Sequence, residues 1–117
     1  MDKKKILVVD DEKECCAFFE NYLTMRGHLV DTAYNGRVAK DLLDKHTYDC
    51  IFFDCKMPEL NGVELIKVIK EKNLKAKKIM ISGYDLVNED FAQDIGVDIF
   101  LGKPFSLEAV RKIIEDS

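Results

Sequence analysis

The chain has 117 residues, of which 47% are hydrophobic and 34% charged, and this balance predicts one compact globular domain over residues 1–117. The formal net charge of -4 argues against nucleic-acid binding by this domain. No apolar run approaches the ~20 residues of a membrane-spanning helix, and the short run after Lys5 is too short for a signal-peptide core. We therefore expect a cytoplasmic protein without membrane contact.

Apolar runs alternate with segments of helical periodicity along the chain. The runs predict five strands, at residues 6–9, 29–33, 50–53, 78–81 and 97–101, of which the second is less apolar and the other four are expected to be buried. The other segments predict helices at residues 13–26 and 37–46, from Asn61, at 87–95 and from Ser106. This order predicts a (βα)₅ α/β fold, in which helices cover both faces of a parallel sheet.

Local signals place several helix ends and faces. Gly27 is expected in a left-handed conformation that closes the first helix, and Asn35-Gly36 in a turn. Asn61 with Glu64 resembles a capping box, and Ser106 is expected to cap the last helix. The apolar residues in register on the first and last helices are Cys15, Phe18, Phe19, Tyr22 and Leu23, and Leu107, Val110 and Ile114.

The four cysteines fit neither a zinc site nor a redox pair. Cys15 and Cys16 are adjacent, whereas Cys50 begins the predicted third strand and Cys55 follows it. We expect reduced, mostly buried thiols. Cys55 directly follows the aspartate that we consider reactive, Asp54.

Reactive or ligating side chains follow four of the predicted strands. Asp10, Asp11 and Glu12 follow the first strand, and the others, each after a different strand, are Asp54, Ser82 and Lys103. In open parallel sheets, ligands bind at the carboxyl ends of the strands. These side chains are therefore expected to meet in one crevice.

Carboxylates gathered in one crevice repel one another unless a cation lies among them. Mg²⁺ suits such a site, because it binds to one or two carboxylates, several waters and a phosphate, and Mn²⁺ is an alternative. Lys103 adds a fixed positive charge, and Ser82 adds a hydroxyl donor. With Asp54 as nucleophile, the set predicts a site for phosphoryl transfer.

Each of these features alone has a simpler interpretation. The acidic residues 10–12 would also suit a helix N-terminus, where they interact favourably with the dipole. Asp54 would suit a turn before Pro58, Ser82-Gly83 a loop, and Lys103 a strand exit. The conjunction at one end of different strands favours the shared site.

Four segments together resemble the receiver domains of bacterial response regulators, over nearly the whole chain. They are ILVVDDE at 6–12, YDCIFFD at 48–54 with Met57-Pro58 and Gly62, ISGY at 81–84 and GVDIFLGKPF at 96–105. The resemblance implies a flavodoxin-like sheet of order 2-1-3-4-5. It also implies a signalling domain, not an enzyme with its own turnover substrate. Asp54 would be phosphorylated by a sensor histidine kinase or phosphotransfer protein, and an effector protein or output domain would respond.

The resemblance also implies roles for single residues. Asp11 would bind Mg²⁺ directly, Asp10 mainly through water, and the backbone carbonyl of Lys56 would complete the protein ligands. Ser82 and Lys103 would hold the phosphoryl oxygens, and a cis peptide bond before Pro104 would aim Lys103 into the site.

Phe100 matches the family's aromatic switch position. An inward turn of its ring would change the surface around the fourth helix, the fifth strand and the fifth helix. Its simpler interpretation is a core aromatic of the fifth strand.

Lys56 and Tyr84 flank the path by which water would attack the phosphorylated aspartate. The pair is similar to that of a single-domain phosphorelay shuttle and predicts a long-lived phosphoryl group. The alternative is that both side chains face solvent and contact partners.

Three other functions fit the sequence less well. A haloacid-dehalogenase-type phosphatase needs an acidic residue where Lys56 stands, and a pseudo-receiver would lack part of the acidic and lysine set. A flavin binder of the same fold needs a phosphate-binding loop after the first strand, where Asp10-Asp11-Glu12 would repel phosphate.

Overall fold

The protein is described by a computed structural model that covers residues 3–54, 67–68, 71, 75–82, 96–102 and 105–116, with the backbone alone at Ser82. The strands in these ranges are β1 (Lys5–Val9), β2 (Leu29–Ala33), β3 (Cys50–Asp54), β4 (Lys77–Ser82) and β5 (Ile99–Gly102). The helices are α1 (Lys13–Met25), α2 (Gly36–Lys45) and α5 (Leu107–Glu115). Lys67, Val68 and Glu71 are also helical. The proposed capping box at Asn61 and Glu64 and the helix predicted at 87–95 lie outside the described residues.

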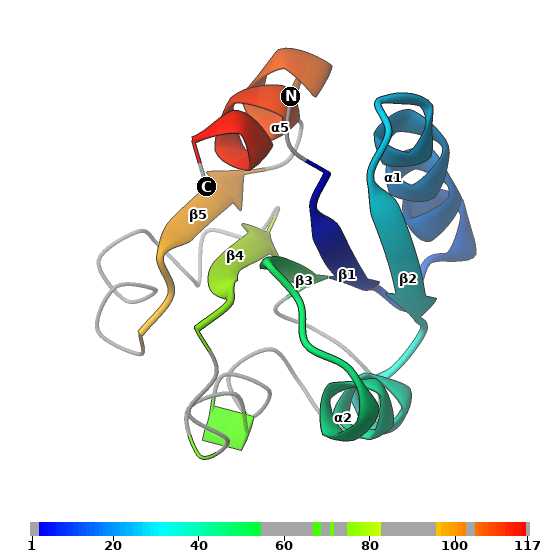
Figure 1. The fold of residues 1–117 in the computed structure, drawn as a ribbon, viewed down its shortest axis with the longest axis vertical. Coiled ribbons are helices and arrows are strands. Elements are labelled where there is room, and N and C mark those ends of the chain that lie inside the picture. The colour runs from blue at the N-terminus through cyan, green and yellow to red at the C-terminus, as the bar shows by residue number, and fades with distance from the viewer. Residues whose placement is uncertain are drawn as a thin grey trace.

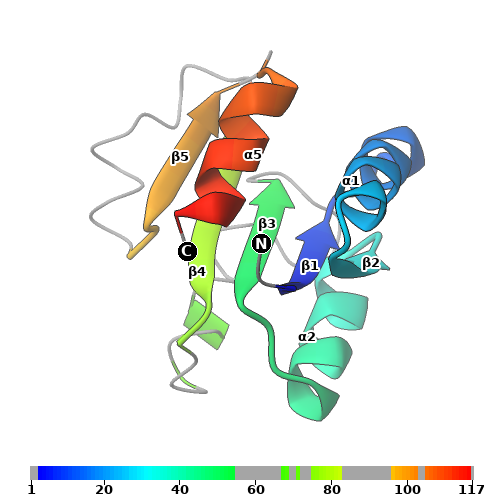
Figure 2. The ribbon, with the colours of Figure 1, turned by 45° about the horizontal axis from the view of Figure 1, so that its top comes forward.

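All strand pairs are parallel, and the sheet has the order β2-β1-β3-β4-β5. The arrows of β1, β3 and β5 point the same way in Figure 2, and α1 and α5 lie on one face of the sheet with α2 on the other (Figures 1 and 2). The predicted α/β fold, its five strands and the order 2-1-3-4-5 are confirmed.

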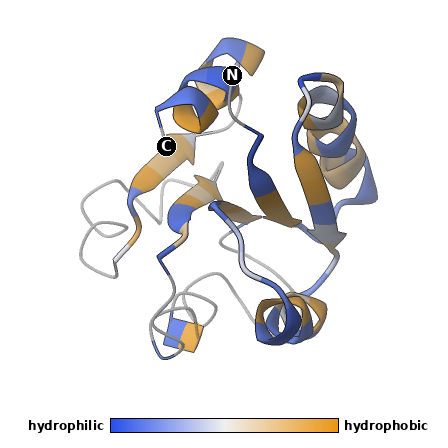
Figure 3. Cartoon of the chain, in the orientation of Figure 1, coloured by the Kyte–Doolittle hydropathy of each residue, from blue (hydrophilic) through white to orange (hydrophobic). Residues whose placement is uncertain are grey.

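Alternate residues of the strands fill two separate cores, because successive side chains of a strand point to opposite faces. Ile6 and Val8 pack with α1 and α5, whereas Leu7 and Val9 pack on the α2 side. Figure 3 shows the resulting apolar strands between helices that carry polar outer surfaces. Continuous apolar runs therefore marked strands that are covered on both faces.

In α1 the buried residues are Cys16, Phe19 and Leu23. Of the other apolar residues predicted in register, Cys15 and Tyr22 are half-buried against the same core, whereas Phe18 is 41% exposed. Phe19 lies against Phe52, with ring centroids 5.1 Å apart, and this contact sets the rotation of the helix. Gly27 has φ 93° and closes the helix as predicted.

Helix α2 begins one residue earlier than predicted. The Asn35 side chain accepts a hydrogen bond from the backbone N–H of Val38 at 2.9 Å, so Asn35 is the N-cap and Gly36 is the first helical residue. The turn signal at Asn35-Gly36 was therefore a helix start.

At the other end of the chain, Ser106 caps α5 as predicted, accepting from the N–H of Ala109 at 3.1 Å. The buried face is Val110, Ile113 and Ile114, whereas Leu107 is 44% exposed. Leu107 was expected on the buried face, but it is the first helical residue and lies at the exposed end of the helix.

Strand β5 begins at Ile99, two residues later than predicted. The Asp98 carboxylate accepts a hydrogen bond from the N–H of Lys78 at 2.8 Å, while its own N–H donates to the Lys78 carbonyl. Asp98 thus caps the start of β4 before β5 begins. None of the helices within the described ranges is both long enough and apolar enough to cross a membrane.

Candidate functional site

The carboxyl ends of β1 and β3 bring two predicted site residues to the same edge of the sheet. Val9 of β1 pairs with Phe53 of β3, and the residues that follow this pair are Asp10 and Asp54. Asp10 is fully buried and Asp54 is 6% exposed. Buried carboxylates are rare unless they are paired or functional, so two at neighbouring strand ends mark this edge as the candidate site.

Two exposed carboxylates lie beside Asp10. The carboxylate oxygens of Asp10, Asp11 and Glu12 lie within 4.8 Å of one another. Octahedral Mg²⁺ places ligand oxygens about 2.0–2.1 Å from the ion, which puts neighbouring ligands about 3 Å apart and opposite ones about 4 Å apart. The loop therefore fits one hard cation with small side-chain movements, and its oxygen-only donors suit Mg²⁺ or Mn²⁺.

Hydrogen bonds hold this loop against the sheet and the helix. The N–H of Asp10 donates to the Ala33 carbonyl at 3.0 Å, which continues the pairing of β1 with β2. The N–H of Glu12 donates to Asp10 Oδ1 at 2.9 Å. Glu12 is the N-cap of α1, but its side chain makes no capping hydrogen bond. The simpler interpretation of the acidic residues, a favourable interaction with the helix dipole, does not depend on such a bond.

Cys16 lies directly beneath the loop, in the first turn of α1. Its thiol donates to the backbone carbonyl of Asp10 at 3.4 Å. Burial, followed by the negative charge of Asp10, raises the pKa of Cys16 to about 11, so the side chain stays a protonated thiol. Cys15, Cys16 and Cys50 carry reduced thiols, as predicted, and Cys55 lies outside the described residues.

The structure describes only some of the other predicted site residues. The backbone of Ser82 pairs with Gly102 at the same edge of the sheet, across β4 and β5. Phe100 pairs with Met80 and packs, half-buried, against the core on the α2 side. Lys103 and Pro104 lie outside the described residues, and so do the two others that were singled out, Lys56 and Tyr84.

Sequence reasoning missed a contact at the rim of the site. Lys13 Nζ lies 5.5 Å from the centre of the Tyr34 ring, within the range of a cation–π interaction. Lys13 begins α1 and Tyr34 follows β2, so only the pairing of β1 with β2 brings them together. No local signal in the sequence marks this pair.

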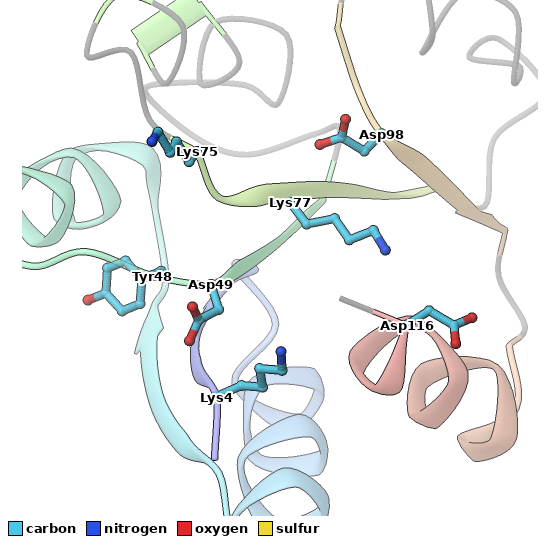
Figure 4. Close-up of a pocket in the computed structure, with 7 residues that line it drawn as sticks. All are labelled: Lys4, Tyr48, Asp49, Lys75, Lys77, Asp98 and Asp116. Atoms are coloured by element: carbon cyan, nitrogen blue, oxygen red, sulfur yellow. The ribbon is translucent and has the colours of Figure 1, made fainter. Parts of the chain in front are cut away.

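A groove lies at the opposite edge of the sheet, at the amino ends of the strands (Figure 4). It has a volume of about 490 Å³ and is lined by Lys4, Tyr48, Asp49, Lys75, Lys77, Asp98 and Asp116. Its lysines and aspartates are equal in number, so it favours neither anions nor cations. Asp49 accepts from the N–H of Lys5 at 2.8 Å and thereby caps β1, as Asp98 caps β4. We interpret these two carboxylates as structural.

Comparison with known proteins agrees with the geometry of the carboxyl edge. The family described as "Response regulator receiver domain" matches residues 6–115. The chain belongs to this family. Receiver domains are signalling domains of two-component systems, and they are not enzymes in the usual sense.

Similar proteins support the same family membership. The receiver domain is 33% identical to the response regulator ArlR of Staphylococcus aureus over 104 residues, which are 89% of this chain and 48% of the relative. It thus spans about half the length of this curated relative. Among solved structures, the receiver domain of Francisella response regulator 1452 has a TM-score of 0.89 at 29% identity, covering 97% of this chain and 95% of that one.

A third relative was solved with ligands. TrrA of Thermotoga maritima, in complex with Mg²⁺-BeF, has a TM-score of 0.86 at 29% identity and covers 97% of both chains. The bound Mg²⁺ and BeF are features of the TrrA structure.

Proposed function

We propose that this receiver domain accepts a phosphoryl group on Asp54. The observation that carries the proposal is the buried Asp54 carboxylate at the end of β3, one residue beyond the pairing of Phe53 with Val9 and so beside Asp10. The donor is a phosphohistidine of a sensor histidine kinase or of a phosphotransfer protein. An Asp54 oxygen forms a bond to phosphorus while the P–N bond breaks, and the imidazole leaves with the electron pair.

The acidic loop would hold Mg²⁺, or Mn²⁺ in its place. Asp11 is exposed and can ligate the ion directly, whereas the buried Asp10 acts mainly through water. Asp54 and the backbone carbonyl of Lys56 complete the protein ligands in this proposal. When bound, the ion neutralises the charge that develops on the phosphoryl oxygens.

Two more side chains complete the proposed site. Lys103 pairs with the phosphoryl oxygens as a fixed cation, and the Ser82 hydroxyl donates to them. Movement of Ser82 would be coupled to Phe100, which is half-buried against the core on the α2 side. The surface that would change on phosphorylation is formed by the helix predicted at residues 87–95, β5 and α5. It would contact an effector protein or an output domain. We expect a shift in population and not a new fold.

The other expectations from the sequence belong to the same proposal. Residues 1–117 form one receiver domain that acts in the cytoplasm, binds no nucleic acid itself and has no separate turnover substrate. Its net charge of -4 supports the part that concerns nucleic acid.

Treatment with acetyl phosphate tests the proposal. With Mg²⁺, intact-mass measurement should show the addition of one phosphoryl group, labile to hydroxylamine. Asp54→Asn should abolish the addition, while Asp49→Asn, at the opposite end of β3, should leave it unchanged. Removal of Mg²⁺ with a chelator should prevent it, and Mn²⁺ should restore it. Equal phosphorylation of Asp54→Asn would show that Asp54 is not the acceptor.

A further inference from the structure

Cys16 contacts the candidate site from inside the protein. Its side chain is 1% exposed and lies in the apolar core between the sheet and the helices α1 and α5. The thiol donates to the carbonyl oxygen of Asp10 at 3.4 Å. A thiol is a weak donor, but this one is shielded from water, which would otherwise compete for the same carbonyl.

Three hydrogen bonds join Cys16, Asp10 and Glu12 in a closed ring. The N–H of Glu12 donates to Asp10 Oδ1 at 2.9 Å, and the N–H of Cys16 donates to the Glu12 carbonyl at 3.2 Å. The thiol of Cys16 closes the ring on the Asp10 carbonyl. Both the peptide group and the carboxylate of Asp10 are therefore tied to the first turn of α1.

We infer that Cys16 is a positioning residue for the cation site, which it orders by holding the Asp10 peptide group through its thiol. The inference rests on the proposed function, because it assumes that Asp10 and Asp11 serve a cation. The bond fixes the backbone at Asp10, and the backbone sets the directions of the Asp10 and Asp11 carboxylates. Without it, the loop samples more orientations, and the cation must select the productive one.

A purely structural role predicts a different result, and the chain supplies a matched control. Cys50 is also fully buried, in the same apolar core, but it lies on β3 at the far end from Asp54. Truncation of either cysteine removes a similar buried volume. Only truncation of Cys16 removes a donor from the acidic loop.

The experiment measures Mg²⁺ affinity from the amide NMR shifts of Asp11 and Glu12 during titration with MgCl₂. The variants are Cys16→Ala, Cys16→Ser and the control Cys50→Ala, each with its thermal midpoint measured. We expect Cys16→Ala to weaken Mg²⁺ binding about two- to fivefold, the range for one weak hydrogen bond. Cys16→Ser has nearly the volume of alanine and keeps a donor, so it should recover at least half of the loss. Cys50→Ala should bind Mg²⁺ as the wild type does.

The outcomes separate the inference from the proposed function. Wild-type affinity in Cys16→Ala, equal weakening in Cys50→Ala, or a serine variant no better than alanine would each overturn the positioning role. A wild-type protein that neither binds Mg²⁺ nor accepts a phosphoryl group would instead overturn the proposed function, and the inference with it.

Discussion

The backbone N–H of Lys4 donates a hydrogen bond to Nδ1 of His28 at 3.1 Å, across the starts of β1 and β2. The His28 side chain is 3% exposed. Burial, and then the charges of Arg26 and Lys4, lower the pKa of His28 from its ordinary 6.5. A ring that accepts at Nδ1 is neutral, and protonation would remove the acceptor.

This relationship predicts a loss of stability in mild acid. Above pH 6.5, His28 is neutral in both the folded and unfolded states. Below it, the unfolded state binds a proton that the folded state does not, so the free energy of unfolding falls as pH falls toward the lowered pKa. The slope from His28 is at most about 1.4 kcal/mol per pH unit. Urea unfolding at several pH values should show a shallower slope for His28→Asn. A slope in His28→Asn equal to that of the wild type would contradict the prediction.

The hydroxyl of the buried Tyr48 donates to Asp31 Oδ2 at 2.7 Å and joins the segment just before β3 to β2. Burial and this hydrogen bond raise the pKa of Tyr48, so the hydroxyl stays protonated. Tyr48→Phe should lower the free energy of unfolding by about 1.5 kcal/mol, the lower end for a bond to a charged group, because Asp31 is half-exposed. Tyr34→Phe, at an exposed tyrosine, should cost little. A double-mutant cycle with Asp31→Asn measures the coupling, and a value near zero would contradict the prediction.

Neighbouring phenylalanines on α1 should differ greatly in their contribution to stability. Phe19 is fully buried against Phe52, whereas Phe18 is 41% exposed. Phe19→Ala should destabilise the fold by about 3–5 kcal/mol, and Phe18→Ala by about 1 kcal/mol or less. Chemical denaturation of the two variants makes the comparison. Equal losses would mean that the helix is rotated from the position described.

Removal of one charge from the acidic loop should have opposite effects with and without metal. In a chelator, Asp11→Asn should raise the thermal midpoint, because it relieves repulsion among Asp10, Asp11 and Glu12. At a Mg²⁺ concentration ten times its dissociation constant, the wild type should gain about 1.4 kcal/mol, and the variant should gain much less. Asp10→Asn should weaken Mg²⁺ binding less than Asp11→Asn. Identical Mg²⁺ responses in wild type and variants would exclude this site.

Lys56 and Tyr84 are expected to lengthen the life of the phosphorylated state, a prediction from the sequence alone. A cationic stem and an aromatic ring beside the phosphoryl group would exclude the attacking water. Decay of the phosphorylated protein in Mg²⁺ buffer should be faster for Lys56→Asn and for Tyr84→Ala. Unchanged or slower decay in both would favour the alternative, in which the two side chains contact partners.

The fold was predictable because burial of the sheet on both faces leaves continuous apolar runs, as in β1 and β3. The predictions that failed depended on tertiary contacts. The sequence does not indicate which of two adjacent cysteines is more deeply buried. The contact of Phe19 with Phe52 fixes the rotation of α1, and this rotation buries Cys16. Asp98 lies within an apolar run, and its role as a cap is visible only from its neighbour Lys78.

The meeting of Asp10 and Asp54 was predictable for a different reason. Parallel strands end at one edge, so residues that follow different strands share it. The contacts of Lys13 with Tyr34 and of Cys16 with Asp10 were not predictable, because they depend on rotamers and on packing within the loop.

The order of the sheet has a consequence for how the chain folds. Pairing of β1 with β2 joins residues 24 apart, as Lys4 with His28, and pairing of β4 with β5 joins residues 20 apart, as Lys78 with Asp98. Pairing of β1 with β3 joins residues 44 apart, as Lys5 with Asp49, because β2 and α2 lie between these two strands in the sequence. Closure of this longest loop costs the most chain entropy. The unit from β1 to β2 can therefore form early, while the two aspartates of the candidate site come together only when the slower central pairing is complete.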